Sequence, residues 1–92
     1  MIGHFSDADT EKLFRSEPVR RFRNIEAVAR RKLLQLNAAQ RRDDLRVPPG
    51  NRLEALRGSR KGQHSIRIND QWRVCFVWGD DGLYGVEIVD YH

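Results

Sequence analysis

The run from Trp72 to Trp78 constrains the fold of this chain more than any other part of its sequence. Large apolar side chains occupy every second position of the run, namely Trp72, Val74, Phe76 and Trp78. Arg73 and Cys75 fall between them, and successive side chains of a strand point to opposite faces of a sheet. The run therefore predicts a β-strand with one face in the core and Arg73 on the other face.

Two further stretches alternate in the same way. Their apolar or aromatic positions are His64, Ile66 and Ile68 in the first stretch, and Tyr84, Val86 and Ile88 in the second. The sequences Asn69-Asp70 and Gly79-Asp80-Asp81-Gly82 lie between the runs and are typical of hairpin turns. Residues 1–5 alternate weakly and favour an edge strand. Together these patterns predict a small, mainly antiparallel sheet with one apolar face.

The first half of the chain has helical spacing instead. Residues 6–9 offer N-cap side chains for a short helix that ends near Phe14, and Pro18 suits the first position of a second helix. Across residues 19–38, apolar side chains recur at spacings of three, four and seven. Two helices that cover the apolar face of the sheet give a two-layer α+β fold, and we expect residues 1–92 to form one domain.

The net charge of the chain indicates which classes of partner it binds. The chain has 17 Lys and Arg against 13 Asp and Glu, a formal net charge of +4, and this balance favours an anionic partner such as nucleic acid, an acidic protein or a membrane surface. The outer side of the second predicted helix is rich in arginine (Arg20, Arg23, Arg30 and Arg31). This set fits either a solvated helix face or contact with phosphates or an acidic partner.

Several classes of protein are disfavoured. One cysteine excludes an internal disulfide, and the three scattered histidines lack metal-ligand spacing, so we expect no metal and no cofactor. Motifs for nucleotide triphosphates and common hydrolases are absent. The sequence shows neither a leader nor an apolar run of about 20 residues, so we expect a cytoplasmic protein without a membrane span.

Arg73 is the most informative candidate for chemistry. A charge in the middle of an apolar strand is costly unless it is paired. Arg73 is therefore either bound to a carboxylate such as Glu54 or Glu87, or presented to an anion on the open face of the sheet. The glycine-bounded basic loop 58–62 fits either an ordinary hairpin turn or a phosphate contact.

The sequence closes on Asp90-Tyr91-His92. Metal-free RNA cleavage needs one group that accepts the 2′-hydroxyl proton, one that stabilises charge on the phosphate and one that protonates the departing oxygen. Histidine transfers protons near neutral pH, and tyrosine stacks on bases. Terminal residues often fray, so this chemistry depends on an ordered last strand.

Two long stretches carry a family resemblance. Residues 50–69 (Gly50-Asn51-Arg52-Leu53-Glu54 through Ser65-Ile66-Arg67-Ile68-Asn69), followed by Gln71-Trp72-Arg73-Val74-Cys75-Phe76 and the closing Asp90-Tyr91-His92, resemble HigB toxins of the RelE-like superfamily. Residues 6–11 and Pro48 to Leu56 are similar to the GraT-type subgroup. The resemblance covers essentially the whole chain.

The resemblance implies a RelE-like fold and a toxin that cleaves mRNA in the ribosomal decoding site by 2′-hydroxyl attack. It implies a HigA-like helix-turn-helix antitoxin as partner, with operator DNA bound only through the toxin–antitoxin complex. The implied catalytic positions are Arg73, Tyr91 and His92, with Asp90 beside them and Arg57 in place of a family lysine. Candidate RNA contacts are Arg52, Arg60, Lys61 and Arg67.

Glu54 departs from the family pattern, because relatives often have histidine there. Glu54 either accepts the proton or pairs with Arg57 or Arg73 and tempers the activity. Three functions therefore stay open: a ribosome-dependent endoribonuclease, a toxin-fold binding protein that acts mainly with its antitoxin in operon autoregulation, and a basic RNA-binding domain without chemistry.

Overall fold

The computed structural model describes residues 1–90. Its α-helices are α1 (Ala8–Phe14) and α2 (Glu26–Ala38), and its short 3₁₀ turns are η1 (Arg20–Ile25), η2 (Arg42–Arg46), η3 (Pro49–Asn51) and η4 (Gly58–Arg60). The strands are β1 (Glu54–Ala55), β2 (His64–Arg67), β3 (Trp72–Gly79) and β4 (Gly82–Asp90). They form one antiparallel sheet in the order β1-β2-β3-β4.

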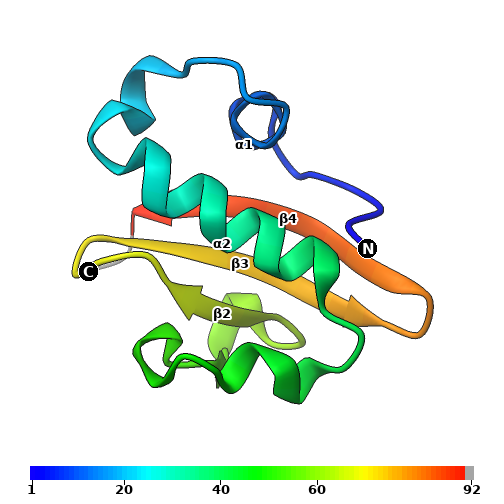
Figure 1. The fold of residues 1–92 in the computed structure, drawn as a ribbon. Coiled ribbons are helices and arrows are strands. Elements are labelled where there is room, and N and C mark those ends of the chain that lie inside the picture. Colours follow the sequence, from blue (N-terminus) through cyan, green and yellow to red (C-terminus); the bar gives the residue numbers. More distant parts are fainter. Residues whose placement is uncertain (91–92) are drawn as a thin grey trace.

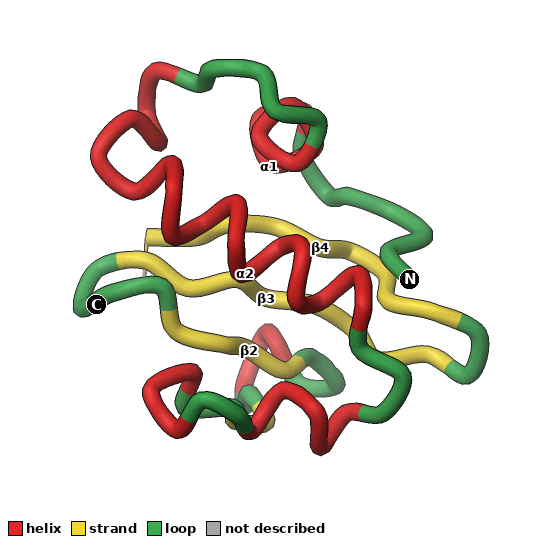
Figure 2. The backbone as a smooth tube through the Cα atoms, in the orientation of Figure 1, coloured by secondary structure: helices red, strands yellow, loops and turns green. Residues whose placement is uncertain are grey.

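Figures 1 and 2 show α2 lying across one face of this sheet. The predicted two-layer arrangement of helices on an antiparallel sheet is confirmed.

The first helix begins where its capping residue predicts. Asp7 has an extended backbone, and its carboxylate accepts a hydrogen bond from the backbone N–H of Thr10 at 3.2 Å. This bond satisfies one of the donors that the first helical turn leaves open. Leu13 is fully buried beneath the helix, so α1 covers the sheet beside β4.

The second helical region differs from the prediction. Its first part is the 3₁₀ segment η1, the regular helix begins only at Glu26, and Pro18 lies before both because Val19 is the N-cap. Residues three apart lie on the same side of a 3₁₀ helix, so Phe22 and Ile25 both reach the core. The ring of Phe22 meets Trp72 edge to face at 5.5 Å between centroids. Tertiary packing thus selects the tighter turn.

The alternation predicted for β3 is confirmed. Val74 and Phe76 are fully buried in the core, and Trp72 and Trp78 pack against it. The prediction for β4 is wrong at its start, because Leu83 is buried whereas Tyr84 is 36% exposed. Gly85 has a left-handed backbone (φ +61), and the β3–β4 pairing is irregular between Cys75 and Val77. This irregularity reverses the alternation.

The N-terminal residues lie along the outer edge of β4. Ile2 and Phe5 form isolated parallel bridges to Leu83 and Val86, with four backbone hydrogen bonds of 2.8–3.1 Å between these segments. This agrees with the expected edge strand. The pairing covers part of an edge that would otherwise expose unpaired N–H and C=O groups.

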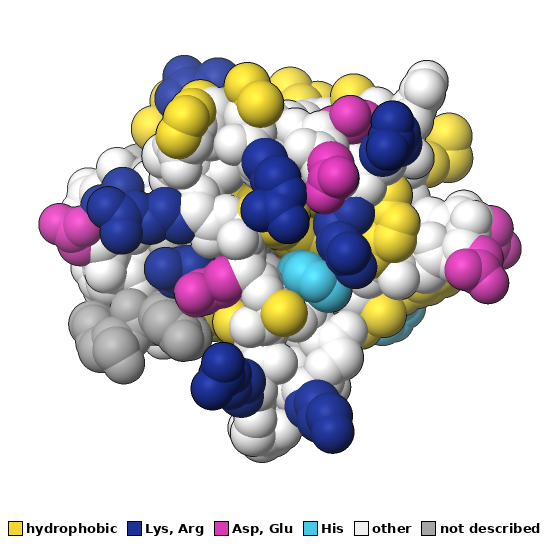
Figure 3. Space-filling model, turned by 90° about the horizontal axis from the view of Figure 1, so that it is seen from below, with side chains coloured by type: hydrophobic (Ala, Val, Ile, Leu, Met, Phe, Trp, Pro, Cys, Tyr) yellow, Lys and Arg dark blue, Asp and Glu magenta, His cyan; other side chains and the backbone are white. Residues whose placement is uncertain are grey.

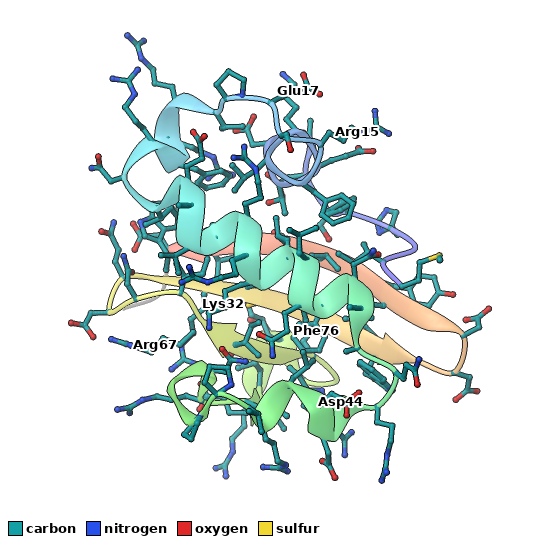
Figure 4. All side chains as sticks on the ribbon, viewed as in Figure 1. Arg15, Glu17, Lys32, Asp44, Arg67 and Phe76 are labelled. Atoms are coloured by element: carbon teal, nitrogen blue, oxygen red, sulfur yellow. The ribbon has the colours of Figure 1, made fainter. Side chains whose placement is uncertain are left out.

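A buried asparagine attaches the segment before β1 to α2. Asn51 is fully buried, and its amide donates to the carbonyl of Leu45 at 3.0 Å and to Oε1 of Gln35 at 3.1 Å. Its oxygen accepts from Nζ of Lys32, which points from α2 toward this segment (Figure 4). Because its polar groups are bonded, the buried amide stabilises the connection. This connection leads into β1, which pairs with β2 and carries Glu54.

Candidate active site

The face of the sheet away from α2 carries the polar side chains of the strands. Glu54 lies directly opposite Ser65, Ser65 opposite Cys75, and Cys75 opposite Glu87. Directly opposite residues of neighbouring strands point to the same face, so these four side chains form one row across all four strands. Arg73 shares the face because it lies two positions from Cys75. We call this surface the charged face.

Arg73 is paired. Its Nη1 donates to Oε1 of Glu54 at 2.9 Å and to Oγ of Ser65 at 3.0 Å. The Arg73 side chain is 16% exposed and the Glu54 side chain 45%. The sequence left a carboxylate partner and an open anion site as alternatives for Arg73, and the structure shows the ion pair with Glu54. The Glu54 side chain is thus partly exposed to solvent and lies beside the guanidinium of Arg73, which is always charged.

Arg60 reaches the same face from the loop between β1 and β2. Its Nη1 donates to Oε1 of Glu87 at 2.8 Å and to Oε1 of Gln63 at 3.0 Å. The hydrogen bond with Glu87 raises the pKa of the Arg60 guanidinium, although partial burial opposes this. Gly58 begins the turn with a left-handed backbone (φ +65) that glycine adopts without strain. Glu87, one of two carboxylates considered for Arg73, therefore binds Arg60 instead.

Cys75 lies between these two ion pairs. Its side chain is fully buried, and burial raises the pKa of the thiol, with smaller opposing influences from the surrounding charges. A buried neutral thiol is a poor nucleophile. Cys75 therefore contributes packing to the charged face.

Arg67 is the direct neighbour of Arg73 across the β2–β3 pair. Like charges in this position destabilise a sheet unless each is compensated. Arg67 pairs with Asp70, and Arg73 pairs with Glu54. In Figure 4 Arg67 extends outward at the edge of the molecule. The structure thus places two of the predicted site arginines side by side.

The remaining basic candidates lie around β1. Arg57 and Glu54 line an open hollow of about 500 Å³ together with Ala55 and Leu56. Arg52, with a left-handed backbone (φ +47), and Lys61 are both exposed. Figure 3 views the molecule from the side of this segment and shows basic side chains spread over the surface with fewer acidic ones between them. The predicted RNA contacts therefore extend from the charged face over the segment 52–61.

The chain end is described only to Asp90. This residue closes β4 opposite Trp72, and its carboxylate accepts from Nε2 of Gln71 at 3.0 Å. The predicted catalytic residues Tyr91 and His92 lie outside the described residues.

Sequence reasoning missed Ser65 and Gln63 on the charged face, and it considered Glu87 only as a partner of Arg73, not of Arg60. The alternation of β2 and β4 contains a signal for Ser65 and Glu87, because both fall between apolar positions. It shows their face but not the strand register that brings them to a particular arginine.

Neither a metal-binding cluster nor a membrane-spanning helix is present within residues 1–90. No group of three or more His, Cys, Asp or Glu side chains there is arranged to hold a metal ion. No helix in the same residues is both long and apolar enough to cross a membrane.

Comparison with known proteins gives a family match over nearly the whole chain. Residues 3–92 match the profile described as the RelE-like toxin of the type II toxin–antitoxin system HigB. Toxin HigB-1 of Vibrio cholerae serotype O1 is 45% identical over 82 residues, which covers 87% of this chain and 86% of that protein. A Haemophilus influenzae protein is 40% identical over 55 residues, 60% of this chain and 54% of its own length.

Solved structures share the fold at low identity. YafQ from E. coli strain BL21(DE3) has a TM-score of 0.61 at 15% identity, covering 98% of this chain and 91% of its own. A chain of the heterotetrameric YoeB–YefM toxin–antitoxin complex from Staphylococcus aureus has a TM-score of 0.63 at 19% identity, covering 100% and 98%. The predicted RelE-like fold is confirmed by these similarities.

Proposed function

Because this chain belongs to the HigB-like family of RelE-like toxins from type II toxin–antitoxin systems, we propose that it is a metal-independent endoribonuclease. In this proposal it cuts messenger RNA in the ribosomal decoding site by attack of a 2′-hydroxyl and so inhibits translation. The observation that carries the proposal is the Arg73–Glu54 pair on the charged face, in which a cation and a half-exposed carboxylate lie 2.9 Å apart.

The proposed division of roles follows from charge and exposure. Arg73 stabilises negative charge that develops on the phosphate, because a guanidinium stays protonated and presents several donors. Glu54 accepts the 2′-hydroxyl proton, since its carboxylate is the more exposed partner of the pair. His92 protonates the departing 5′-oxygen, Tyr91 stacks on a base, and Asp90 supports them. Arg57, beside Glu54 in the hollow, binds phosphate.

RNA affinity in this proposal comes from the basic residues around the site. Arg52, Arg60, Lys61 and Arg67 contact phosphates and position the substrate without reading its sequence. A small open site places few groups around the substrate, so the ribosome supplies much of the positioning.

A HigA-like helix-turn-helix antitoxin is the proposed partner, and operator DNA is bound only through the complex. The similarity of the fold to a chain of the YoeB–YefM toxin–antitoxin complex supports an antitoxin partner. Residues 6–11 and 48–56 carry the similarity to the GraT-type toxins, and we propose that subgroup for this chain.

The test is cleavage of a defined mRNA on purified ribosomes, with mapping of the new 5′ ends and chelator present throughout. We expect cleavage by the wild type, with free RNA left largely intact. Arg73→Ala should lower the single-turnover rate by about 10²–10³, the usual effect of removing one transition-state charge contact. His92→Gln should lower it by about 10²–10⁴, the range for a general acid or base.

Arg15→Ala is the matched control for Arg73→Ala. Arg15 also pairs with a glutamate, Glu11 at 2.9 Å, but it is exposed on the surface beyond α1. Its loss should leave the cleavage rate unchanged. Wild-type protein that cuts no ribosome-bound mRNA, or that needs a metal ion, would refute the proposed activity.

One observation favours a second candidate function. The Glu54 carboxylate neutralises Arg73 on the charged face, and a neutralised arginine attracts RNA phosphate less strongly. The chain would then be a toxin-fold binding protein with weak or no nuclease activity, acting mainly with its antitoxin in operon autoregulation. Repression of the operator by the complex, with no cleavage by the isolated chain, would support this function.

A further inference from the structure

Glu87 has no part in the reaction proposed above, yet it lies on the charged face at the centre of β4. Its side chain is 26% exposed, and Glu87 lies directly opposite Cys75 in the row across the sheet. We propose that Glu87 is a positioning residue for RNA binding: it holds the Arg60 guanidinium against the charged face, where Arg60 binds an RNA phosphate. This inference rests on the proposed function and assigns Glu87 a role within it.

The contact joins distant parts of the chain. Arg60 belongs to the turn between β1 and β2, whereas Glu87 belongs to β4 at the other side of the sheet, 27 residues later. An unanchored arginine at the surface loses much rotamer freedom when it binds a ligand. Here that freedom is restricted beforehand, because Nη1 of Arg60 donates to both Glu87 at 2.8 Å and Gln63 at 3.0 Å.

The anchored guanidinium keeps donors for a ligand. Both hydrogen bonds that the Arg60 guanidinium makes within residues 1–90 use Nη1, and its side chain is 34% exposed. The planar guanidinium fork suits two oxygens of one phosphate. Because Glu87 and Gln63 take only Nη1, the Nε–Nη2 edge is available to RNA.

If Glu87 positions Arg60, its removal has the opposite effect on RNA binding from the one expected if Glu87 only neutralises the charge of Arg60. If Glu87 served only to cancel the charge of Arg60, its removal would strengthen RNA binding. If Glu87 positions Arg60, its removal frees a long side chain and weakens binding. The structure favours positioning, because one nitrogen of Arg60 donates to two acceptors and the Arg60 side chain is only 34% exposed.

A double-mutant cycle tests the proposal with ribosome-bound mRNA as the probe. Glu87→Ala and Arg60→Ala should each raise KM about tenfold, as expected for loss of one charge-assisted contact, with little change in kcat. The double variant should be no worse than Arg60→Ala, because Glu87 acts through Arg60. Glu87→Gln keeps an acceptor oxygen and should recover part of the loss.

Glu26→Ala is the matched control. Glu26 pairs with Arg30 at 3.2 Å, with side-chain exposures of 38% and 24% close to those of the Glu87–Arg60 pair, but it lies on α2. Its KM should equal that of the wild type. Thermal unfolding of each variant identifies loss of fold, and Glu87→Gln carries the test if Glu87→Ala does not fold.

The outcomes distinguish this inference from the proposed function. A wild type that binds ribosomes without cutting mRNA refutes the nuclease. The ribosome affinities of the wild type, Glu87→Ala, Arg60→Ala and the double variant then decide the role of Glu87. Tighter binding by Glu87→Ala would show neutralisation and overturn the proposal. Effects of Glu87→Ala and Arg60→Ala that add in the double variant would overturn it as well.

Discussion

The two faces of the sheet are built from the same strands but are stabilised by different forces. The face beneath α2 carries fully buried apolar side chains such as Ile66, Val74 and Phe76. The charged face, one residue away along each strand, carries partly exposed ion pairs such as Arg73–Glu54 and Arg60–Glu87. The first face gains free energy by removing apolar surface from water, and the second by charge-assisted hydrogen bonds in contact with water.

This difference separates stability from function. Tight packing of an apolar core resists any change of volume. Partly exposed ion pairs contribute little to stability because water and salt compete with them. Groups on the charged face can therefore exchange a carboxylate for a phosphate at small cost to the fold. The apolar face supplies the rigid platform for that exchange.

The largest expected effect is on the apolar face. Phe76→Ala removes a fully buried ring from the core and should lower the free energy of unfolding by about 3–5 kcal/mol. Val77→Ala is the matched control, because Val77 is the next residue and is 38% exposed. Urea denaturation of both variants measures the difference. Equal losses for the two variants would contradict the assignment of the faces.

A smaller effect on stability and a distinct effect on activity are expected at Glu54. Glu54→Gln keeps the shape and an acceptor for Arg73 but removes the proton acceptor, so cleavage of ribosome-bound mRNA should fall by about a hundredfold or more. Stability should change by only about 1 kcal/mol, because the pair is partly exposed. Single-turnover rates and urea denaturation measure the two quantities. Cleavage that is unchanged or faster in Glu54→Gln would show instead that Glu54 tempers Arg73.

The smallest expected effect concerns pH at His64. This imidazole stacks on Phe76 with centroids 6.2 Å apart, and burial, with a smaller influence of Arg42, lowers its pKa from the ordinary 6.5. The unfolded chain therefore binds a proton more readily, so this residue makes the fold less stable as pH falls through about 6.5. His64→Phe keeps an aromatic ring and cannot be protonated.

Denaturation of both proteins at pH 7.5 and 5.5 checks this sign. The wild type should lose more stability on acidification than His64→Phe does. A larger loss in the variant would mean that the folded chain favours the protonated imidazole.

Local sequence patterns are enough to determine some features of this fold. The cap at Asp7, the alternation in β3 and the turn at Gly79 to Gly82 are properties of neighbouring residues, and all three are present as predicted. Local patterns fail at η1 and at Tyr84. In both places a contact from a distant element or an irregular strand pairing outweighs the intrinsic preference of the segment.

The candidate site divides in the same way. Arg73 could be placed on the polar side of a strand from its neighbours alone, because strand alternation has a period of two. Its carboxylate partner could not be chosen between Glu54 and Glu87, since both occupy outward positions on other strands. The choice follows from the register, which sets Glu54 opposite Ser65 and Glu87 opposite Cys75, and from the turn that carries Arg60 to Glu87. Ion pairs act over a few ångströms, so chain distance says little about them and the folded arrangement of strands and loops determines which charges meet.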